Sequence, residues 1–398
     1  MSDVLILRTP VLVDGAGALV GDFGLAIATR AGKEEVIARG DYHLLKATYP
    51  TAGLRIASVV TSQFANAHTH LDLSTHATME GEFEQFVGAL AAHRRAFPGA
   101  RGLDAAASGM RQMMDQNCSA VGDIIARESV MRAELAHSPM AGVAYWEVVC
   151  THQSDAPAAL QSLLQAVQTW RRLQRPGGPV VGLSPHSPYL VCRDMLKALA
   201  RLSIDEGVPL QIHVAESPAE TEFFRTGGGP LAAVLASLGW RKPPTAAGLG
   251  IPVGPSMTPI RYLSEIGFLE AAPTLVHCVN VTDADVRIIA EYKCPVVTCP
   301  RSNRNLRCGV FPWEKFVSAG VPIALATDSV ASANDLNLLS ELKACLGRHG
   351  PLLDTSTVLG WLTAGAAKAM QLPPPAIAAG YPASALVVLE NPLAQIIG

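Results

Sequence analysis

The sequence predicts an α/β fold, a closed (β/α)8 TIM barrel of parallel strands joined to a small β-sandwich domain. Between residues 58 and 370, short apolar runs alternate with longer stretches of helical character, which is typical of parallel βα units. There are eight such runs, and eight strands are what a barrel of this kind requires. The expected strands cover 58–64, 120–125, 140–149, 179–184, 210–213, 274–278, 295–299 and 323–327.

Helices are expected between these strands, for example over 155–173, 192–206, 282–292 and 313–319. The alternative is an open doubly wound sheet, for which we would expect a Gly-rich phosphate loop after the first strand. Here the first strand is followed by His68 and His70 instead, and the closed barrel is favoured. One stretch rich in Gly and Pro, 226–259, fits no βα unit, and we expect a long loop near the barrel mouth.

The two ends of the chain are expected to form the small domain together. Residues 1–57 contain short alternating strands separated by Gly-rich turns, and 384–389 is a further strand after a turn at 380–383. We therefore expect a β-sandwich built from 1–57 plus 371–398, and a hydrolase-type barrel over 58–370.

Composition excludes several classes of function. The net charge of the 398 residues is −3, and no long basic block is present to track a nucleic acid backbone. No apolar run reaches membrane-spanning length, and the N-terminus lacks the pattern of a signal peptide. The eight cysteines are scattered without a C-x-x-C pair, which suits buried thiols in a reducing compartment. We expect a cytoplasmic protein that binds neither nucleic acid nor membrane.

His68 and His70 are two residues apart beside an expected strand. Residues i and i+2 of a strand point to the same side, so both imidazoles can face one divalent metal. A polar strand end that meets solvent is the plainer interpretation, and the pair alone does not decide between the two.

The placement of other ionisable residues favours the metal site. His213, His277 and Asp328 end the fifth, sixth and eighth expected strands, and His186 follows the fourth. Barrel enzymes gather functional residues at these carboxyl ends. Ionisable groups are rarely buried without partners, so such a collection is poorly explained as core packing.

These motifs resemble the metal-dependent hydrolases of the amidohydrolase superfamily, in the branch that deaminates nucleobases and nucleosides. The resemblance covers nearly the whole chain and rests on His68-x-His70, His213-x-x-Glu216, His277 and Thr327-Asp328-Ser329. It implies that His68, His70, His213 and Asp328 bind one divalent metal. Imidazoles with one carboxylate suit zinc, our first expectation, or iron(II). Binuclear members carry a carboxylated lysine at the end of strand four, and no lysine occurs there.

The resemblance also implies three catalytic roles. Glu216 would protonate the ring nitrogen of the substrate and pass a proton to departing ammonia. Asp328 would take a proton from the attacking water, and His277 would hydrogen-bond that water or the tetrahedral intermediate. The alternatives are a first-turn helix acid for Glu216 and a packing histidine for His277.

The substrate is implied less directly. The segment around His186 resembles the one that contacts ribose hydroxyls in adenosine-type deaminases. Arg301, followed by Ser302 and Asn303, resembles the form found in aminodeoxyfutalosine deaminases, whose substrate carries a carboxylate. Arg301, or Arg127 after the second strand, would pair with that carboxylate, although a rim arginine is more often an ordinary surface residue. The basic run over 304–309 departs from the family pattern.

Together these implications predict a hydrolase acting on C–N bonds of cyclic amidines. It would deaminate a small-molecule adenine nucleoside, aminodeoxyfutalosine of menaquinone biosynthesis first among the candidates, and release ammonia. We also expect a homodimer. The alternatives are an S-adenosylhomocysteine or adenosine deaminase, a chlorohydrolase-like enzyme and a metal-binding homologue without activity.

Overall fold

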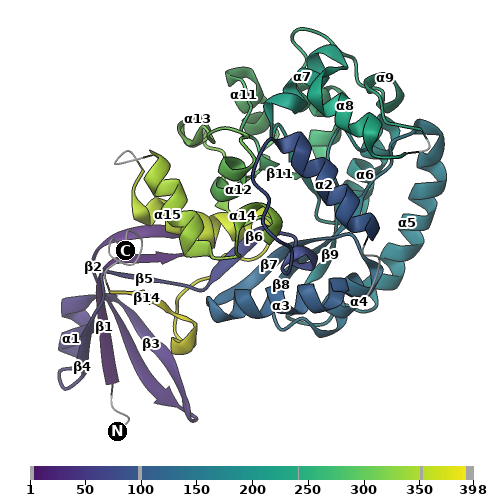
Figure 1. The fold of residues 1–398 in the computed structure, drawn as a ribbon. Coiled ribbons are helices and arrows are strands. Elements are labelled where there is room, and N and C mark those ends of the chain that lie inside the picture. Colours follow the sequence, from purple (N-terminus) through teal and green to yellow (C-terminus); the bar gives the residue numbers. More distant parts are fainter. Residues whose placement is uncertain (1–3, 97–100, 241, 350–352, 391–398) are drawn as a thin grey trace.

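The structure is a computed structural model, and it describes residues 4–96, 101–240, 242–349 and 353–390. Its centre consists of two parallel four-stranded sheets surrounded by helices, which confirms the α/β class (Figure 1). The first sheet contains β6 (Phe64–Thr69), β7 (Cys118–Ile125), β8 (Ala141–Val148) and β9 (Val180–Pro185). The second contains β10 (Gln211–Val214), β11 (Thr274–His277), β12 (Val296–Thr298) and β13 (Ile323–Leu325).

The two sheets meet at both of their edges through isolated parallel bridges. Leu183 of β9 bridges to Leu210, and the amide of Leu183 donates to the carbonyl of Pro209 at 2.9 Å. On the other side Thr69 bridges to Asp328, and the amide of Asp328 donates to the carbonyl of His68 at 3.2 Å. The carboxyl ends of β6 and β13 are therefore held side by side.

The expected helices form close to their predicted bounds. The corresponding segments are α5 (Ala156–Arg171), α6 (Arg193–Glu206), α11 (Asp283–Glu291) and α13 (Trp313–Ser318). Local capping fixes some of these ends. Thr282 and Asp285 form a capping box at the start of α11, and Gly207 ends α6 in the left-handed conformation with φ 61°. The other barrel helices used below are α2 (Phe83–Ala96), α4 (Glu128–His137), α7 (Pro218–Thr226), α12 (Pro300–Asn305) and α15 (Leu338–His349).

Two sequence predictions need correction. The expected strand 58–64 is split: β5 (Val59–Thr61) pairs with β1 and β14 of the six-stranded sheet, and the strand of the central parallel sheet is β6. The stretch 226–259 is not a long loop, because it contains α8 (Gly229–Ser237) and α9 (Ala246–Leu249). Its glycines serve as helix ends, as Gly250 does with φ 78°, while Leu231 and Leu235 of α8 are buried in the core.

The chain ends meet in one mixed sheet of six strands (Figure 1). Its order is β14-β5-β1-β2-β3, with β4 also paired to β1. The bounds are β1 (Val4–Asp14), β2 (Gly17–Arg30), β3 (Lys33–Asp41), β4 (Gly53–Ile56) and β14 (Val387–Leu389). The antiparallel pairing of β14 with β5 joins the carboxyl end to the amino end, as expected. A sandwich stays a prediction, and residues 391–398 of that expected domain lie outside the described ranges.

No helix in the described ranges has both the length and the apolar character to cross a membrane. The eight cysteines are all buried and free of disulfides, consistent with the thiols expected from their spacing.

Candidate metal centre and active site

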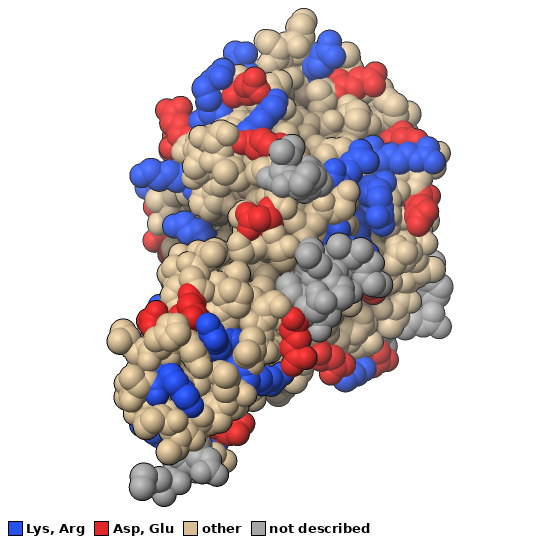
Figure 2. Space-filling view, turned by 90° about the vertical axis from the view of Figure 1, so that its left-hand side faces the viewer, with Lys and Arg blue, Asp and Glu red and all other residues tan. Residues whose placement is uncertain are grey.

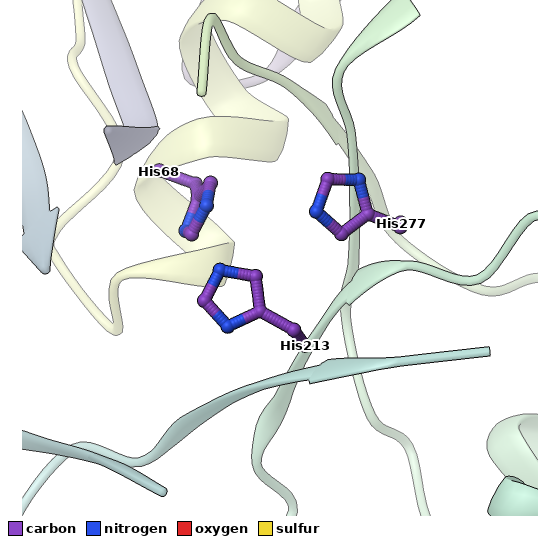
Figure 3. Close-up of side chains that lie close together, drawn as sticks. All are labelled: His68, His213 and His277. Atoms are coloured by element: carbon purple, nitrogen blue, oxygen red, sulfur yellow. The ribbon is translucent and has the colours of Figure 1, made fainter. Parts of the chain in front are cut away.

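Histidines from three barrel strands point toward one another at the carboxyl ends of those strands (Figure 3). His68, His213 and His277 come from β6, β10 and β11, and one nitrogen of each lies within 4.8 Å of the others. His70 joins them, with its Nε2 3.4 Å from Nε2 of His213. The structure thus brings together the four histidines that the sequence placed at three strand ends, His68 and His70 sharing one of them.

Hydrogen bonds behind two of these rings assign their tautomers. Nδ1 of His213 lies 2.7 Å from the carbonyl oxygen of His186, which can only accept, so Nδ1 carries the proton. Nδ1 of His68 lies 2.6 Å from Oε1 of Gln211, whose amide nitrogen donates to the carbonyl of Ala67 at 3.0 Å. Both rings therefore present an Nε2 lone pair to the centre. Burial, and next the neighbouring His68, lower the pKa of His213 well below its usual value, so this ring is neutral.

Asp328 supplies the carboxylate of the cluster. Its Oδ1 lies 3.6 Å from Nε2 of His68 and 3.5 Å from Nε2 of His70. Its Oδ2 accepts hydrogen bonds from the hydroxyls of Ser302 at 2.6 Å and Ser332 at 3.0 Å. Burial alone would raise the pKa of Asp328, but the adjacent imidazoles of His68 and His70 hold it well below its usual range. The residue has φ 58°, a strained conformation that aims this carboxylate at the histidines.

The donor set fits a single divalent cation. Nε2 of His68 is buried without a hydrogen-bond partner, although its lone pair points at the centre. Nε2 of His213, which bears a lone pair, lies 3.4 Å from Nε2 of His70, a spacing at which both nitrogens can bind one shared cation. His68, His70 and Asp328 form one group with metal-ligand spacing, and His213 closes it from the opposite strand.

Glu216 lies directly beyond β10 and is buried. Its Oε1 is 3.4 Å from Nε2 of His277, whose Nδ1 is 3.0 Å from Oδ1 of Asn303. Burial raises the pKa of Glu216 well above its usual value, and the charge of Asp328 adds to this. Burial lowers the pKa of His277 to about 4. Burial therefore favours the protonated carboxyl group of Glu216 and the neutral imidazole of His277, which lie side by side.

The plainer interpretation of Glu216 is not supported, because α7 begins only at Pro218 with Ser217 as its N-cap. The acid in the first turn of that helix is Glu220, whose Oε2 accepts from the amide of Glu216 at 2.8 Å. Glu216 is thus held by the helix start without belonging to it.

His186 lies beside this cluster, with Nδ1 2.7 Å from Oε1 of Glu147. Sequence reasoning missed Glu147, although an acid inside the apolar run 140–149 was a usable signal. It also missed Gln211, which lies two residues before His213 and so on the same side of its strand.

A cavity of about 340 Å³ opens over the cluster and has two unlike parts. The polar part is formed by His70, His186, His213, Glu216, His277, Asp328 and Ser329. The apolar part is formed mainly by α2 and the end of α8, with Leu73, Phe83, Phe86, Val87, Leu90, Ala91, Val149, Tyr189, Leu190, Leu238 and Trp240. A ligand that fills it needs one polar end and one large apolar end.

The structure argues against the predicted contact of Arg301 with substrate. Its Nε donates to Glu341 at 2.6 Å and its Nη1 to Asp335 at 2.7 Å, so both faces of the guanidinium are used inside the protein. Neither Arg301 nor Arg127 lines the cavity over the metal cluster, and Nε of Arg127 lies 3.8 Å from a carboxylate oxygen of Asp72. These two arginines were chosen from sequence position alone, which does not show where a long side chain ends.

Ser302 and Asn303 were also expected to touch substrate. In the structure Ser302 donates to Asp328, and Asn303 contacts His277. Neither side chain lines the cavity over the metal cluster.

Histidines and one aspartate at the carboxyl ends of parallel strands, with a buried acid beside them, define a metal-dependent hydrolase. The chain belongs to the amidohydrolase family, whose model matches residues 59–398. Its enzymes are hydrolases, and the curated relatives of this chain are named as deaminases.

Among those relatives is aminodeoxyfutalosine deaminase of Deinococcus radiodurans, 40% identical over 345 residues, which cover 85% of this chain and 79% of the relative. Two solved structures share the fold. Helicobacter pylori aminofutalosine deaminase in complex with methylthio-coformycin has a TM-score of 0.78 at 22% identity, covering 99% of this chain and 95% of that one. An adenosine deaminase from Xanthomonas campestris with bound zinc has a TM-score of 0.70 at 19% identity, covering 98% and 85%.

Proposed function

We propose that this protein hydrolytically deaminates an adenine nucleoside that carries a large aromatic group on its 5′ side, aminodeoxyfutalosine being the candidate. The observation that supports it most is the cavity, which joins the Glu216–His277 pair and the metal cluster to an apolar arm. The relative at 40% identity bears the name of this activity. The reaction replaces the exocyclic amine of the purine by oxygen from water and releases ammonia.

The proposed ligands of a single divalent ion, zinc, are His68, His70, His213 and Asp328. An ion held there would lower the pKa of a water molecule, so that hydroxide is available for attack near neutral pH. Asp328 would accept a proton from that water; its low pKa keeps the carboxylate ionised, and hydrogen bonds from Ser302 and Ser332 fix its Oδ2. Glu216 in its protonated form donates to the ring nitrogen next to the reacting carbon. His277, neutral and backed by Asn303, orients the water or the developing oxyanion.

The rest of the nucleoside would lie along the cavity. His186, fixed by Glu147, contacts the ribose hydroxyls at the polar end. The aromatic group rests on Phe86 and Trp240 in the apolar arm. None of the described residues that line this cavity is a lysine or arginine, so we propose that the distal carboxylate points to the cavity mouth.

We further propose that the two four-stranded sheets close into one eight-stranded (β/α)8 barrel through their two bridges. Residues 58–370 would form it, and 1–57 plus 371–398 the small β-sandwich domain. A homodimer in the cytoplasm is the proposed working state.

The experiment uses zinc-loaded protein and one panel of substrates. The panel compares ammonia with chloride as the leaving group and compares nucleosides that differ in their 5′ group. We expect ammonia from aminodeoxyfutalosine, less from adenosine and S-adenosylhomocysteine, and no chloride from a chlorotriazine. Trp240→Ala removes an aromatic contact worth about 0.5–1.5 kcal/mol, so kcat/KM for aminodeoxyfutalosine should fall by about two- to tenfold. The value for adenosine should stay unchanged and serves as the internal control. Equal losses on both nucleosides would contradict the proposed arm.

A further inference from the structure

A second and larger cavity, about 730 Å³, lies between α12, α15 and the segment 307–311. It is formed in part by the basic run 304–309, which the sequence pattern left unexplained. Five of its lining side chains are cationic and none is acidic; the cations are Arg301, Arg304, Arg307, Lys343 and Arg348. A volume of this size is typical of small-molecule sites.

Acids inside the protein offset only part of this charge. Arg301 is paired with Glu341 and Asp335, and Nη1 of Arg307 lies 2.6 Å from Oε1 of Glu82. Within the described part of the chain, neither Arg304 nor Arg348 has an ion pair, and Arg304 contacts only the neutral side-chain oxygen of Asn305. Gathered cations repel one another, so the cavity favours an anion.

One residue of the lining connects this cavity to the first one. Asn303 is almost fully buried, and its Oδ1 lies 3.0 Å from Nδ1 of His277, which lines the cavity over the metal cluster. This one side chain therefore lies between the two cavities.

We propose that this cavity binds a small phosphate-bearing molecule and that Asn303 transmits its occupancy to His277. Arginine forks match phosphate oxygens in two-point contacts, which Arg304 and Arg348 of the lining can supply. A polynucleotide fits less well: on the face seen in Figure 2, basic and acidic residues are interspersed without a continuous basic stripe. Binding at this site goes beyond the proposed deamination and does not depend on it.

Calorimetric titration of the zinc-loaded protein tests the site with orthophosphate and ribose 5-phosphate, which carry no adenine for the first cavity. Succinate is the carboxylate control. We expect saturable binding of ribose 5-phosphate that weakens with added salt, and no comparable binding of succinate. The double variant Arg304→Met, Arg348→Met should lose at least about tenfold in affinity, the scale of one charged hydrogen bond. Arg201→Met, which removes an exposed cation on α6 paired with Asp205, should change nothing.

Binding of neither phosphate compound to the parent, equal binding of succinate, or the same loss in Arg201→Met would overturn the proposal. The link through Asn303 has its own readout. Ribose 5-phosphate should change kcat of ammonia release in the parent and leave kcat of the double variant unaltered. An unchanged kcat at saturating ribose 5-phosphate would overturn the link, whereas absence of deamination would be a failure of the proposed function and would leave the binding result intact.

Discussion

Oε1 of Glu216 lies 3.4 Å from Nε2 of His277, and both side chains are buried at the ends of adjacent parallel strands. Burial changes their proton affinities in opposite ways, since it raises the pKa of Glu216 well above its usual value and lowers that of His277 to about 4. Burial therefore favours the neutral form of both groups, in which the acid holds a proton that it can donate. Two neighbouring titratable groups whose pKa values are shifted in opposite directions are typical of acid–base catalysis.

Glu216→Gln should keep the fold and the metal but lose most activity, because glutamine cannot release a proton. General acid–base groups contribute a factor of about 10² to 10⁴, so kcat should fall within that range. Glu222→Gln, an exposed change on the neighbouring helix α7, is the matched control. A Glu216→Gln enzyme within a few-fold of the parent would show that another group moves the proton.

The pH profile of kcat/KM should follow the protonated form of Glu216. Because burial raises its pKa, the active protonated form persists to higher pH than in an ordinary glutamic acid and is lost as pH rises through the raised pKa. The alkaline limb of the parent should be absent in Glu216→Gln, whose residual activity has no such proton to lose. An identical alkaline limb in both proteins would assign it to a different group.

Gln211→Leu should weaken metal binding without touching a ligand. The side chain of Gln211 fixes the Nδ1 proton of His68, so its removal frees the ring to rotate or change tautomer. Partners of this kind contribute about 10- to 100-fold in metal affinity. Competition with a chelator measures the change, and Gln165→Leu on the exposed side of α5 is the control. Equal affinities in the two variants would mean that His68 needs no such partner.

Arg301→Met should reduce stability and affect all substrates alike. It leaves the fully buried Glu341 without its cation, and breaking a buried pair costs about 3–5 kcal/mol. Denaturant unfolding measures the loss. Lys315→Met, which breaks an exposed pair with Asp283, should cost no more than about 1 kcal/mol. A selective loss on the carboxylate-bearing nucleoside at unchanged stability would restore Arg301 as a substrate contact.

The metal cluster was predictable because strand alternation and strand ends determine where its residues lie. His68, His213 and Asp328 each occur at the end of an apolar run, and parallel strands bring those ends to one rim. Glu216 was predictable for the same reason, since it follows His213 closely along the chain.

Features that depend on partners distant in sequence were not predictable in this way. Arg301 was assigned to substrate by resemblance. Its ion-pair partners, Asp335 and Glu341, lie 34 and 40 residues further along the chain, so the sequence did not reveal that its charge is used inside the protein. The 226–259 stretch was expected as a loop because its glycines and prolines hide two helices that they terminate. Glycine and proline indicate an interruption of regular secondary structure, but tertiary packing determines whether the interruption is a loop or the end of a helix.

The measurement that tests the central claim most directly is ammonia release by zinc-loaded protein, with kcat/KM determined in parallel for aminodeoxyfutalosine and adenosine. The apolar arm and the Glu216–His277 pair predict turnover of both adenines and a preference for aminodeoxyfutalosine, because only that substrate fills the arm. Preference for adenosine would contradict the assigned substrate. No ammonia from either nucleoside, with the metal bound and the protein folded, would contradict the deaminase itself.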